Sequence, residues 1–378
     1  MTRLFLLFHG RFPSEKAASL FAAKSAESFA NQGVELTLVV PRRMGRYAEN
    51  AHTYYGVKNN FKITYIPVID IFFLPLLSKV AFFVSFISFS AFSLVFLVFD
   101  ARKDDVIYSN EWMPLYLASF VFKRTFYELH DFPESARGFF KHFFSRMRYI
   151  LAHNIWKKNK LENDFAVPPA KIISIPNAVD IEQFDIKVTK EEARRQLDLP
   201  VAKNIAIYTG HLYGWKGVDT LAAAALLLPA DFLVVFVGGT DKDVASFKSK
   251  FGGDGRIMIA GHKRHTEIPL WQKAADVLVI PNTAKENISA LYTSPMKLFE
   301  YMASSRPVIA SRIPSIQEIV DESSVLFVEP DNAKDLALMI QKICSDTVLG
   351  DRLSKHAMNV VQSFTWESRA RSIISFIS

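Results

Sequence analysis

The chain has 378 residues, half of them hydrophobic, a formal net charge of +7 and a pI near 9.2. At about 150 residues per domain, this length predicts two or three domains. The basic charge favours anionic partners such as nucleotide phosphates, anionic lipid or nucleic acid. The single cysteine, Cys344, excludes an internal disulfide framework and fits a reducing compartment.

The N-terminal segment predicts a strand, a helix and a second strand. The apolar run Leu4–Phe8 is too short for a signal-peptide core and indicates a first buried strand. A helical face follows, formed by Ala18, Phe21, Ala22 and Phe29. Gly33 ends that helix, and Val34–Val40 is the next strand. The loop at residues 9–14 therefore lies at the ligand-binding edge of a βαβ unit. Gly10 in this loop permits a close approach of a ligand or simply makes a turn.

Residues 71–99 form the most unusual stretch, because only Lys79 carries a charge. Residues 80–99 are long enough to span a membrane. Four serines interrupt them, and a strand at Val106–Ser109 follows at once. We therefore expect one or two helices packed on the sheet, with phenylalanines left over for a membrane surface, and keep a true span as the alternative. These phenylalanines have mixed spacings that one buried face does not accommodate: Phe82, Phe83, Phe86, Phe89, Phe92 and Phe96.

The next strand, Thr125–Leu129, ends at His130, a position suited to ligand contact. A hydrogen-bonded loop histidine is the alternative interpretation. Basic and aromatic residues then alternate from Arg137 to Lys160, and this amphipathic pattern predicts an anionic membrane face or an ordinary solvated one. RNA-binding motifs are lacking, so no nucleic-acid partner is expected. Ile172–Ile175 is the last strand predicted in this half.

The second half repeats the alternation of strands and helices. Its predicted strands are Asn204–Tyr208, Phe232–Val237, Ile257–Ala260 and Val277–Pro281. The loop at residues 209–217 contains Gly210 and Lys216 and suits a phosphate, although it matches neither the P-loop nor the dinucleotide fingerprint. The D-x-D sequence from Asp241 to Asp243 falls at an expected helix start, so we interpret it as helix capping rather than a metal site.

Residues 291–312 predict a helix followed by a short strand, Val308–Ala310. Ser294 and Pro295 are expected at the cap and first helical position. A buried face is expected from Met296, Phe299, Met302 and Ala303. Lys297 and Glu300 are then neighbours on another face. A phosphate at the helix start and a sugar hydroxyl on Glu300 form one interpretation, and a surface helix with an ordinary ion pair is the other.

This stretch resembles the donor-site signature of GT-B glycosyltransferases, specifically the retaining enzymes of glycosyltransferase family 4. The matching residues follow the pattern S-P-x-K-x-F-E-Y-M-A-x-G-x-P-V-I-A, with Ser305 in place of the glycine. The family usually has two glutamates eight positions apart. The second matches Glu300, which the resemblance places on the donor ribose, but Tyr292 stands where the first is expected.

Other segments extend the resemblance. Residues 210–217 resemble G-R-L-x-x-x-K-G, which places Lys216 on the donor diphosphate and His211 where an arginine is usual. Lys297 is the expected substitute for that missing charge. Residues 176–180 resemble the interdomain P-N-G-V-D segment, with Ala178 in place of the glycine. Gly261 and His262 resemble the region near the donor base, and His130 the family histidine near the donor sugar and acceptor.

The resemblance implies an α/β GT-B fold, in which two Rossmann-like domains face an interdomain cleft. Residues 1–178 are expected to bind the acceptor, residues 179–364 to bind the sugar nucleotide, and residues 365–378 to form a helix returning to the first domain. The expected catalytic residues are His130, Lys216 and Glu300. The expected donor-binding residues are Gly10, Gly210, His211, Lys216, His262, Thr293, Ser294, Lys297 and Glu300.

The implied activity is metal-independent, retaining transfer of a hexose from a UDP- or GDP-type sugar to a glycan or lipid-linked acceptor. The expected role is cell-surface polysaccharide or glycoconjugate synthesis, without a cofactor. The expected location is cytoplasmic and peripheral, on the inner face of the cytoplasmic membrane. Two alternatives stay open: a non-catalytic nucleotide-sugar or glycan-binding relative, and a GT-B epimerase or phosphorylase.

Overall fold

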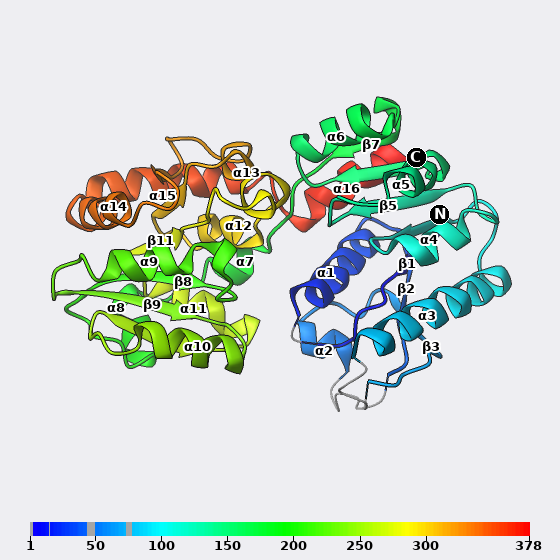
Figure 1. The fold of residues 1–378 in the computed structure, drawn as a ribbon. Helices are drawn as coiled ribbons and strands as arrows, with labels where there is room; N and C mark the ends of the chain where they lie inside the picture. Colours follow the sequence, from blue (N-terminus) through cyan, green and yellow to red (C-terminus); the bar gives the residue numbers. More distant parts are fainter. Residues whose placement is uncertain (1–2, 15, 44–49, 73–77) are drawn as a thin grey trace. The chain divides into compact units, whose positions relative to one another are not determined.

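The computed structural model describes residues 3–14, 16–43, 50–72 and 78–378. The chain forms two compact units, each built around its own sheet (Figure 1). The first unit comprises Met1–Ile175 together with Trp366–Ser378, and the second comprises Pro176–Thr365.

The first unit contains a seven-stranded parallel sheet with the order β3-β2-β1-β4-β5-β6-β7. Its strands are β1 Arg3–Leu7, β2 Glu35–Pro41, β3 Lys62–Ile66, β4 Val106–Ser109, β5 Thr125–Leu129, β6 Tyr149–Ala152 and β7 Ile172–Ser174. Its helices are α1 Ala17–Asn31, α2 Ala51–Tyr55, α3 Ser78–Asp100, α4 Trp112–Ala118, α5 Arg137–Arg146, α6 Ile155–Phe165 and α16 Trp366–Ile377.

Both faces of this sheet are covered, which explains its continuous apolar strands. Leu4 and Leu6 of β1 pack into one core, whereas Phe5 and Leu7 pack into the core on the opposite face. Helix α16 packs beside α1 in the first of these cores (Figure 1). The predicted face of α1 is correct except at Ala18, which is exposed.

One sequence prediction for this unit needs correction. The stretch from Arg137 to Lys160 is not one amphipathic segment, because the buried strand β6 separates α5 from α6. For the apolar stretch of residues 71–99, one or two helices were expected, and its described residues contain one long helix, α3. Residues 73–77 of this stretch lie outside the described parts of the chain. As its spacing indicated, α3 buries Phe86 and Phe89 but exposes Phe83 and Phe92.

The second unit contains a six-stranded parallel sheet with the order β10-β9-β8-β11-β12-β13. Its strands are β8 Asn204–Thr209, β9 Phe232–Val237, β10 Ile257–Gly261, β11 Val277–Ile280, β12 Val308–Ser311 and β13 Leu326–Val328. Its α-helices are α7 Ile181–Phe184, α8 Lys190–Gln196, α9 Val218–Ala225, α10 Asp241–Phe251, α11 Ile268–Lys273, α12 Met296–Ala303, α13 Pro314–Gln317, α14 Ala333–Ser345 and α15 Thr347–Val361. The sequence prediction missed β13. It was right about α10, where Asp243 and Thr240 form a capping box.

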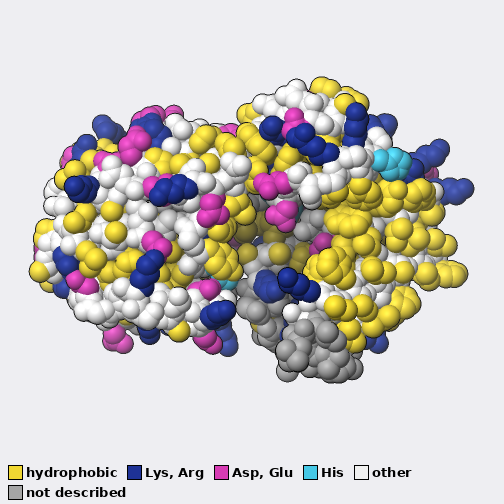
Figure 2. All heavy atoms as spheres, viewed as in Figure 1, with side chains coloured by type: hydrophobic (Ala, Val, Ile, Leu, Met, Phe, Trp, Pro, Cys, Tyr) yellow, Lys and Arg dark blue, Asp and Glu magenta, His cyan; other side chains and the backbone are white. Residues whose placement is uncertain are grey.

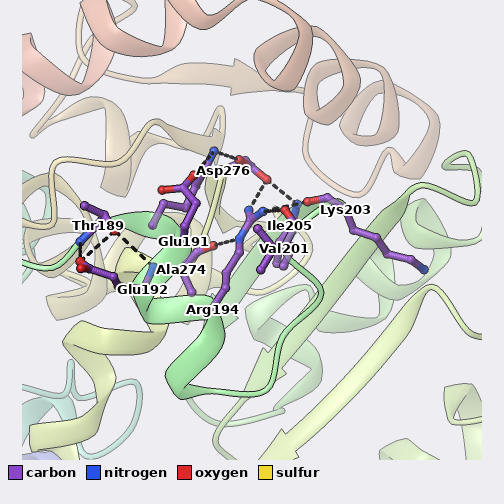
Figure 3. Close-up of polar contacts among 10 residues, drawn as sticks. Thr189, Glu191, Glu192, Arg194, Val201, Lys203, Ile205, Ala274 and Asp276 are labelled. Atoms are coloured by element: carbon purple, nitrogen blue, oxygen red, sulfur yellow. Dashed lines mark hydrogen bonds and ion pairs between the residues drawn. The ribbon is translucent and has the colours of Figure 1, made fainter.

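A buried arginine fixes the amino ends of β8 and β11 (Figure 3). Arg194 of α8 donates to the Ala274 carbonyl oxygen over 2.9 Å and to an Asp276 carboxylate oxygen over 2.5 Å. The same carboxylate oxygen accepts the N–H of Ile205 over 2.7 Å. Ligands bind at the opposite, carboxyl edge of such a sheet. This network therefore stabilises the two strands at the edge away from any bound ligand.

The first unit has a buried polar cluster around Glu128, at the end of β5. Its Oε1 accepts from His153 Nε2 over 2.6 Å and from Arg369 Nη2 of α16 over 2.7 Å. Burial acts to raise the pKa of Glu128, but the charge of Arg369 and the two neighbouring histidines hold it well below its ordinary value. Burial also lowers the pKa of His153 to about 3, so this histidine is neutral in the folded protein at neutral pH. The cluster therefore ties α16 to the sheet through one charged pair.

We predict that Arg369→Ala lowers the free energy of unfolding by about 3–5 kcal/mol, because it leaves the buried Glu128 carboxylate without its cation. Urea denaturation at neutral pH measures this change. Arg371→Ala is the matched control on the same helix: Arg371 is exposed, and its loss is expected to cost no more than about 0.5 kcal/mol. Equal effects of the two substitutions would contradict the role of Arg369.

Candidate functional site

The second unit has a topological switch point between β8 and β11. From these neighbouring strands the sheet continues to β9 on one side and to β12 on the other. In open parallel sheets, ligands bind beyond the carboxyl ends of the strands at such a point. The loops there are residues 210–217 after β8 and residues 281–283 after β11, and most of the predicted donor-binding residues lie on or near them.

Two glycines bring these segments into close contact. Gly217 has a φ of +70°, and a Cβ added to it would lie 1.8 Å from the Pro281 carbonyl oxygen. This close approach holds the Lys216 loop against the loop after β11. Gly210 has a φ of +131°, and a Cβ there would lie 3.0 Å from Nζ of Lys297. The positive φ favours glycine at this position, and a Cβ there would require the Lys297 ammonium to move by a small amount.

Lys297, on the first turn of α12, is buried with only 8% of its surface exposed. Its Nζ has no hydrogen-bond partner within the described parts of the chain and lies 3.7 Å from the centre of the Tyr208 ring. Burial lowers the pKa of Lys297 well below its ordinary value, the charge of Lys216 adds to this effect, and Glu300 opposes it. A buried lysine without a hydrogen-bonded partner is costly, and an anionic ligand would supply that partner.

Lys216 provides a second cation close to the first. Its Nζ lies 4.7 Å from the centre of the Trp215 ring. Burial lowers the pKa of Lys216 to about 8, although the Glu300 charge acts to raise it. The charge of Lys216 therefore disfavours the charged form of Lys297 in the free protein. A diphosphate placed between them would reverse that effect, because it stabilises both charges.

The predicted start of α12 needs correction. The helix begins at Met296 with Pro295 at the N-cap, and no side chain caps it. Ser294 is not the cap: its Oγ accepts the N–H of Asn177 over 3.0 Å, and its carbonyl oxygen accepts from the Asn177 side chain over 2.5 Å. Because Ser294 is hydrogen-bonded to Asn177, it does not cap α12, and the start of this helix has no side-chain cap.

Glu300 contacts a histidine, rather than forming the ordinary surface pair with Lys297. Its Oε1 lies 3.2 Å from Nε2 of His265, and Nδ1 of the same ring lies 3.0 Å from Nε2 of Gln183. The Gln183 amide donates to Nδ1, so the proton on Nε2 is directed at the carboxylate. This relay orients Glu300.

His265 and Gln183 were missed by sequence reasoning, which assigned a role in the loop after β10 to His262 instead. A second histidine three residues after His262 was the available signal. His262 is exposed. It acts through its charge on His211, as do Lys216 and Lys297, which places the four side chains in one region.

The remaining predicted residues of this unit are located as follows. His211 stacks in parallel on Tyr213, with ring centres 4.9 Å apart, and partial burial and the Lys216 charge lower its pKa. Thr293 donates its N–H to the Ile288 carbonyl oxygen over 3.1 Å. Tyr292 ends a short π-helical segment, Ile288–Tyr292, and brings no negative charge where the resemblance expects a glutamate.

Gly10 and His130 belong to the first unit. A Cβ at Gly10 would lie 2.3 Å from the ring of Phe8, which explains this glycine without a ligand. Nε2 of His130 lies 3.1 Å from Glu128 Oε1, and its ring lies 5.0 Å from that of Phe21. The carbonyl oxygen of His130 accepts from Lys157 Nζ over 2.5 Å. The Glu128 cluster thus holds His130 in place, directly after the carboxyl end of β5.

The ligand-type atoms of Glu128, His130 and His153 all lie within 4.8 Å of one another, a spacing that would suit a metal ion. The same Glu128 oxygen, however, accepts from the Arg369 guanidinium over 2.7 Å. A permanent cation therefore already occupies the position that a metal would need. We interpret the cluster as a hydrogen-bonded support of β5.

Comparison with known proteins shows that the chain is similar to glycosyltransferases. The model of the family described as Glycosyl transferases group 1 matches residues 203–346. D-inositol 3-phosphate glycosyltransferase 1 of Catenulispora acidiphila is 24% identical over 241 residues, which cover 60% of this chain and 56% of that protein. The putative teichuronic acid biosynthesis glycosyltransferase TuaC of Bacillus subtilis is 25% identical over 190 residues, which cover 50% and 46%. The chain thus matches about half the length of these curated relatives.

Solved structures match over the whole chain. HepE of Anabaena in complex with UDP-glucose has a TM-score of 0.74 at 17% identity, covering 99% of this chain and 100% of that one. Sucrose-phosphate synthase from Thermosynechococcus elongatus has a TM-score of 0.76 at 19% identity, covering 99% and 98%. Two Rossmann-like units with parallel sheets, arranged as in these proteins along the chain, define the GT-B fold of glycosyltransferases. The predicted fold class is thereby confirmed.

We predict that Lys297→Met weakens UDP binding about 10- to 100-fold, because a charged hydrogen bond to the diphosphate is lost. The same substitution is expected to raise the free energy of unfolding by about 1 kcal/mol or more, because it removes an unsatisfied buried group. Calorimetry with UDP and urea denaturation measure the two effects. Lys248→Met, at an exposed position of the same unit, is the control and is expected to change neither. A variant that loses stability while keeping UDP affinity would contradict the assignment.

Proposed function

We propose that this protein is a retaining glycosyltransferase that transfers a hexose from a UDP- or GDP-sugar to a hydroxyl group of a glycan or lipid-linked acceptor. The observation that carries the proposal is the buried ammonium of Lys297, which has no hydrogen-bond partner among the described residues and lies near Lys216 at the switch point of the second sheet. The expected setting is the synthesis of cell-surface polysaccharide or another glycoconjugate. The UDP complexes of HepE support a nucleotide-sugar donor, and the name of TuaC supports this setting.

In this proposal the two lysines stabilise the negative charge that develops on the leaving diphosphate as the glycosidic bond to the donor breaks. The uncapped start of α12 adds the positive end of a helix dipole. Glu300, oriented by His265, accepts hydrogen bonds from the donor ribose. His130, on the first unit, contacts the donor sugar or the acceptor. These side chains supply the charge stabilisation for which many transferases use a metal ion, so we propose a metal-independent reaction.

A non-catalytic nucleotide-sugar-binding protein is the alternative favoured by one observation, the tyrosine at position 292. A transferase slowly hydrolyses its donor when the acceptor is missing, whereas a binding protein only retains it. Screening UDP- and GDP-hexoses for thermal stabilisation identifies the donor, because a ligand of the native state raises the melting temperature. UDP or GDP release from that donor then separates the two functions.

We predict that Glu300→Ala weakens donor binding more than Glu300→Gln, because glutamine keeps one acceptor oxygen for the ribose. The expected loss for alanine is about 10-fold or more in Kd. Calorimetry with the identified donor and the rate of nucleotide release measure both variants. Glu322→Ala, which removes an exposed carboxylate of the same unit, is the control. Wild-type affinity in Glu300→Ala would remove Glu300 from the site.

We also propose that the enzyme is peripheral on the cytoplasmic face of an anionic membrane, where a lipid-linked acceptor is accessible. Helix α3 provides the supporting observation, because it buries its serines and exposes many apolar side chains. Its four serines, at positions 85, 88, 90 and 93, are buried against the protein. Ser88, Ser90 and Ser93 donate to carbonyl oxygens of the preceding turn, and Ser85 Oγ lies 3.0 Å from His9 Nε2.

The outer face of α3 is apolar. Its exposed residues include Val80, Phe82, Phe83, Ile87, Phe92, Val95, Val98 and Phe99, the last of which is 87% exposed. Phe120 and Val121, after the neighbouring helix α4, are exposed too. Figure 2 shows hydrophobic side chains gathered on this part of the molecule, with Lys and Arg side chains beside them. By length and composition α3 is also able to cross a membrane. We favour surface binding because its serine face packs on the protein.

The same unit also carries exposed basic residues. Lys79, Lys123 and Lys141 are exposed, and the Arg146 guanidinium stacks 3.9 Å from the centre of the Phe120 ring. Each such cation near an anionic bilayer contributes about 1 kcal/mol. Apolar insertion together with these contacts would give reversible binding.

We predict that the protein cosediments with anionic vesicles at low salt, binds neutral vesicles less, and is released as the salt concentration rises. Phe83→Ser/Val98→Ser should weaken binding without unfolding the protein, since both side chains are exposed. Leu338→Ser/Val348→Ser is the matched control, because these exposed apolar residues belong to the second unit. Equal binding to both lipids would refute the electrostatic contribution, and retention after high salt and alkali would favour a true span.

A further inference from the structure

The first unit contains a cavity of about 540 Å³ that no part of the donor site uses. Its walls come from the loop after β1, the end of β2, the start of α2 and the strand β3. The loop after β1 and the end of β2 both lie at the carboxyl edge of the sheet, where α/β proteins bind ligands. A volume of this size accommodates one or two sugar units.

The cavity is lined by side chains of one charge. Arg11, Arg42, Arg43 and Lys62 all border it, and the described residues of its lining include no Asp or Glu. Burial lowers the pKa of Arg43, while the nearby Asp70 acts to raise it and Arg11 to lower it. An anionic ligand would further stabilise these cations. Aromatic residues, among them Phe12 and Tyr65, complete the wall and suit the apolar face of a sugar ring.

Arg43 is held in place before any ligand arrives. Its Nη2 lies 3.0 Å from both the carbonyl oxygen and Nε2 of His9, and its guanidinium lies 5.0 Å from the centre of the Phe72 ring. Burial lowers the pKa of His9 to about 3, so this ring is neutral and accepts the hydrogen bond from Arg43. Nε of Arg43 is buried and has no hydrogen-bond partner within the described residues. The guanidinium is therefore fixed, with donor capacity unused.

We infer that this cavity binds an anionic group of the acceptor glycan, a phosphate or a sugar carboxylate. Planar guanidinium groups bind both kinds of oxyanion through paired hydrogen bonds, so two or more arginines around one cavity favour this chemistry over a neutral sugar. The inference rests on the proposed function for the word acceptor, and it makes that function more specific: the substrate is a charged glycan or glycan phosphate.

The test compares glucose 1-phosphate, glucuronate and glucose as probes of the full chain by titration calorimetry. We expect one or both anions to bind more tightly than glucose. In Arg42→Gln/Lys62→Gln the affinity should fall about tenfold or more, because two charged contacts are lost. Both residues are exposed, so the variant is expected to fold. Lys103→Gln, at an exposed turn of the same unit, is the control and should bind as the wild type does.

Because the lysines of the second unit also suit a phosphate, the same probes are measured with Lys297→Met. Retained anion binding in Lys297→Met and lost binding in Arg42→Gln/Lys62→Gln, with UDP affinity showing the opposite pattern, would support the cavity. Loss only in Lys297→Met, or equal binding of glucose, would overturn it. Preference for glucose 1-phosphate or for glucuronate identifies the anion. Failure of the wild type to bind any nucleotide sugar would contradict the proposed function but not this cavity.

Discussion

The second unit is organised around the buried ammonium group of Lys297, which receives no hydrogen-bond acceptor from the described residues. Lys297 lies beside Gly210 at the end of β8, over the face of the Tyr208 ring. The nearby Lys216 loop contacts the Pro281 carbonyl oxygen closely at Gly217. The Tyr208 ring attracts the ammonium, but a ring face does not replace a hydrogen-bond acceptor. These features are explained if the missing partner is a ligand, since preorganised charges stabilise a leaving group without further rearrangement.

The first unit also has features that are energetically unfavourable without a ligand or partner. Helix α3 exposes phenylalanines to solvent and buries serines, and the loops after β1 and β2 gather arginines around one cavity. Each arrangement is unfavourable for a protein surrounded only by water. Together they are consistent with a partner that combines an apolar surface with negative charge, as a glycan attached to a membrane lipid through phosphate does.

Much of the fold is predictable from the sequence, because parallel strands that are buried on both faces appear as continuous apolar runs. Strands β4, β5 and β9 begin and end where they were predicted. Strand β6 was missed because four residues between basic, aromatic segments resemble a helix. The site was harder to predict from the sequence. Helical spacing correctly assigned Lys297 to a helix but did not indicate that its side chain is buried. Ser294 accepts a hydrogen bond from Asn177, 117 residues away, and Glu300 contacts His265, 35 residues away. Local sequence patterns do not encode contacts between such distant segments.

The contact between Arg369 and Glu128 has a consequence for how the protein is made. Glu128 leaves the ribosome long before the helix that neutralises it, because 241 residues separate the two. Domains commonly fold in the order of their synthesis. Here the first unit remains incomplete, with the Glu128 carboxylate lacking its arginine and an uncovered face on α1, until translation has passed through the whole second unit. The second unit is continuous in sequence and is able to fold first, so the part of the chain synthesised earliest would reach its final structure last.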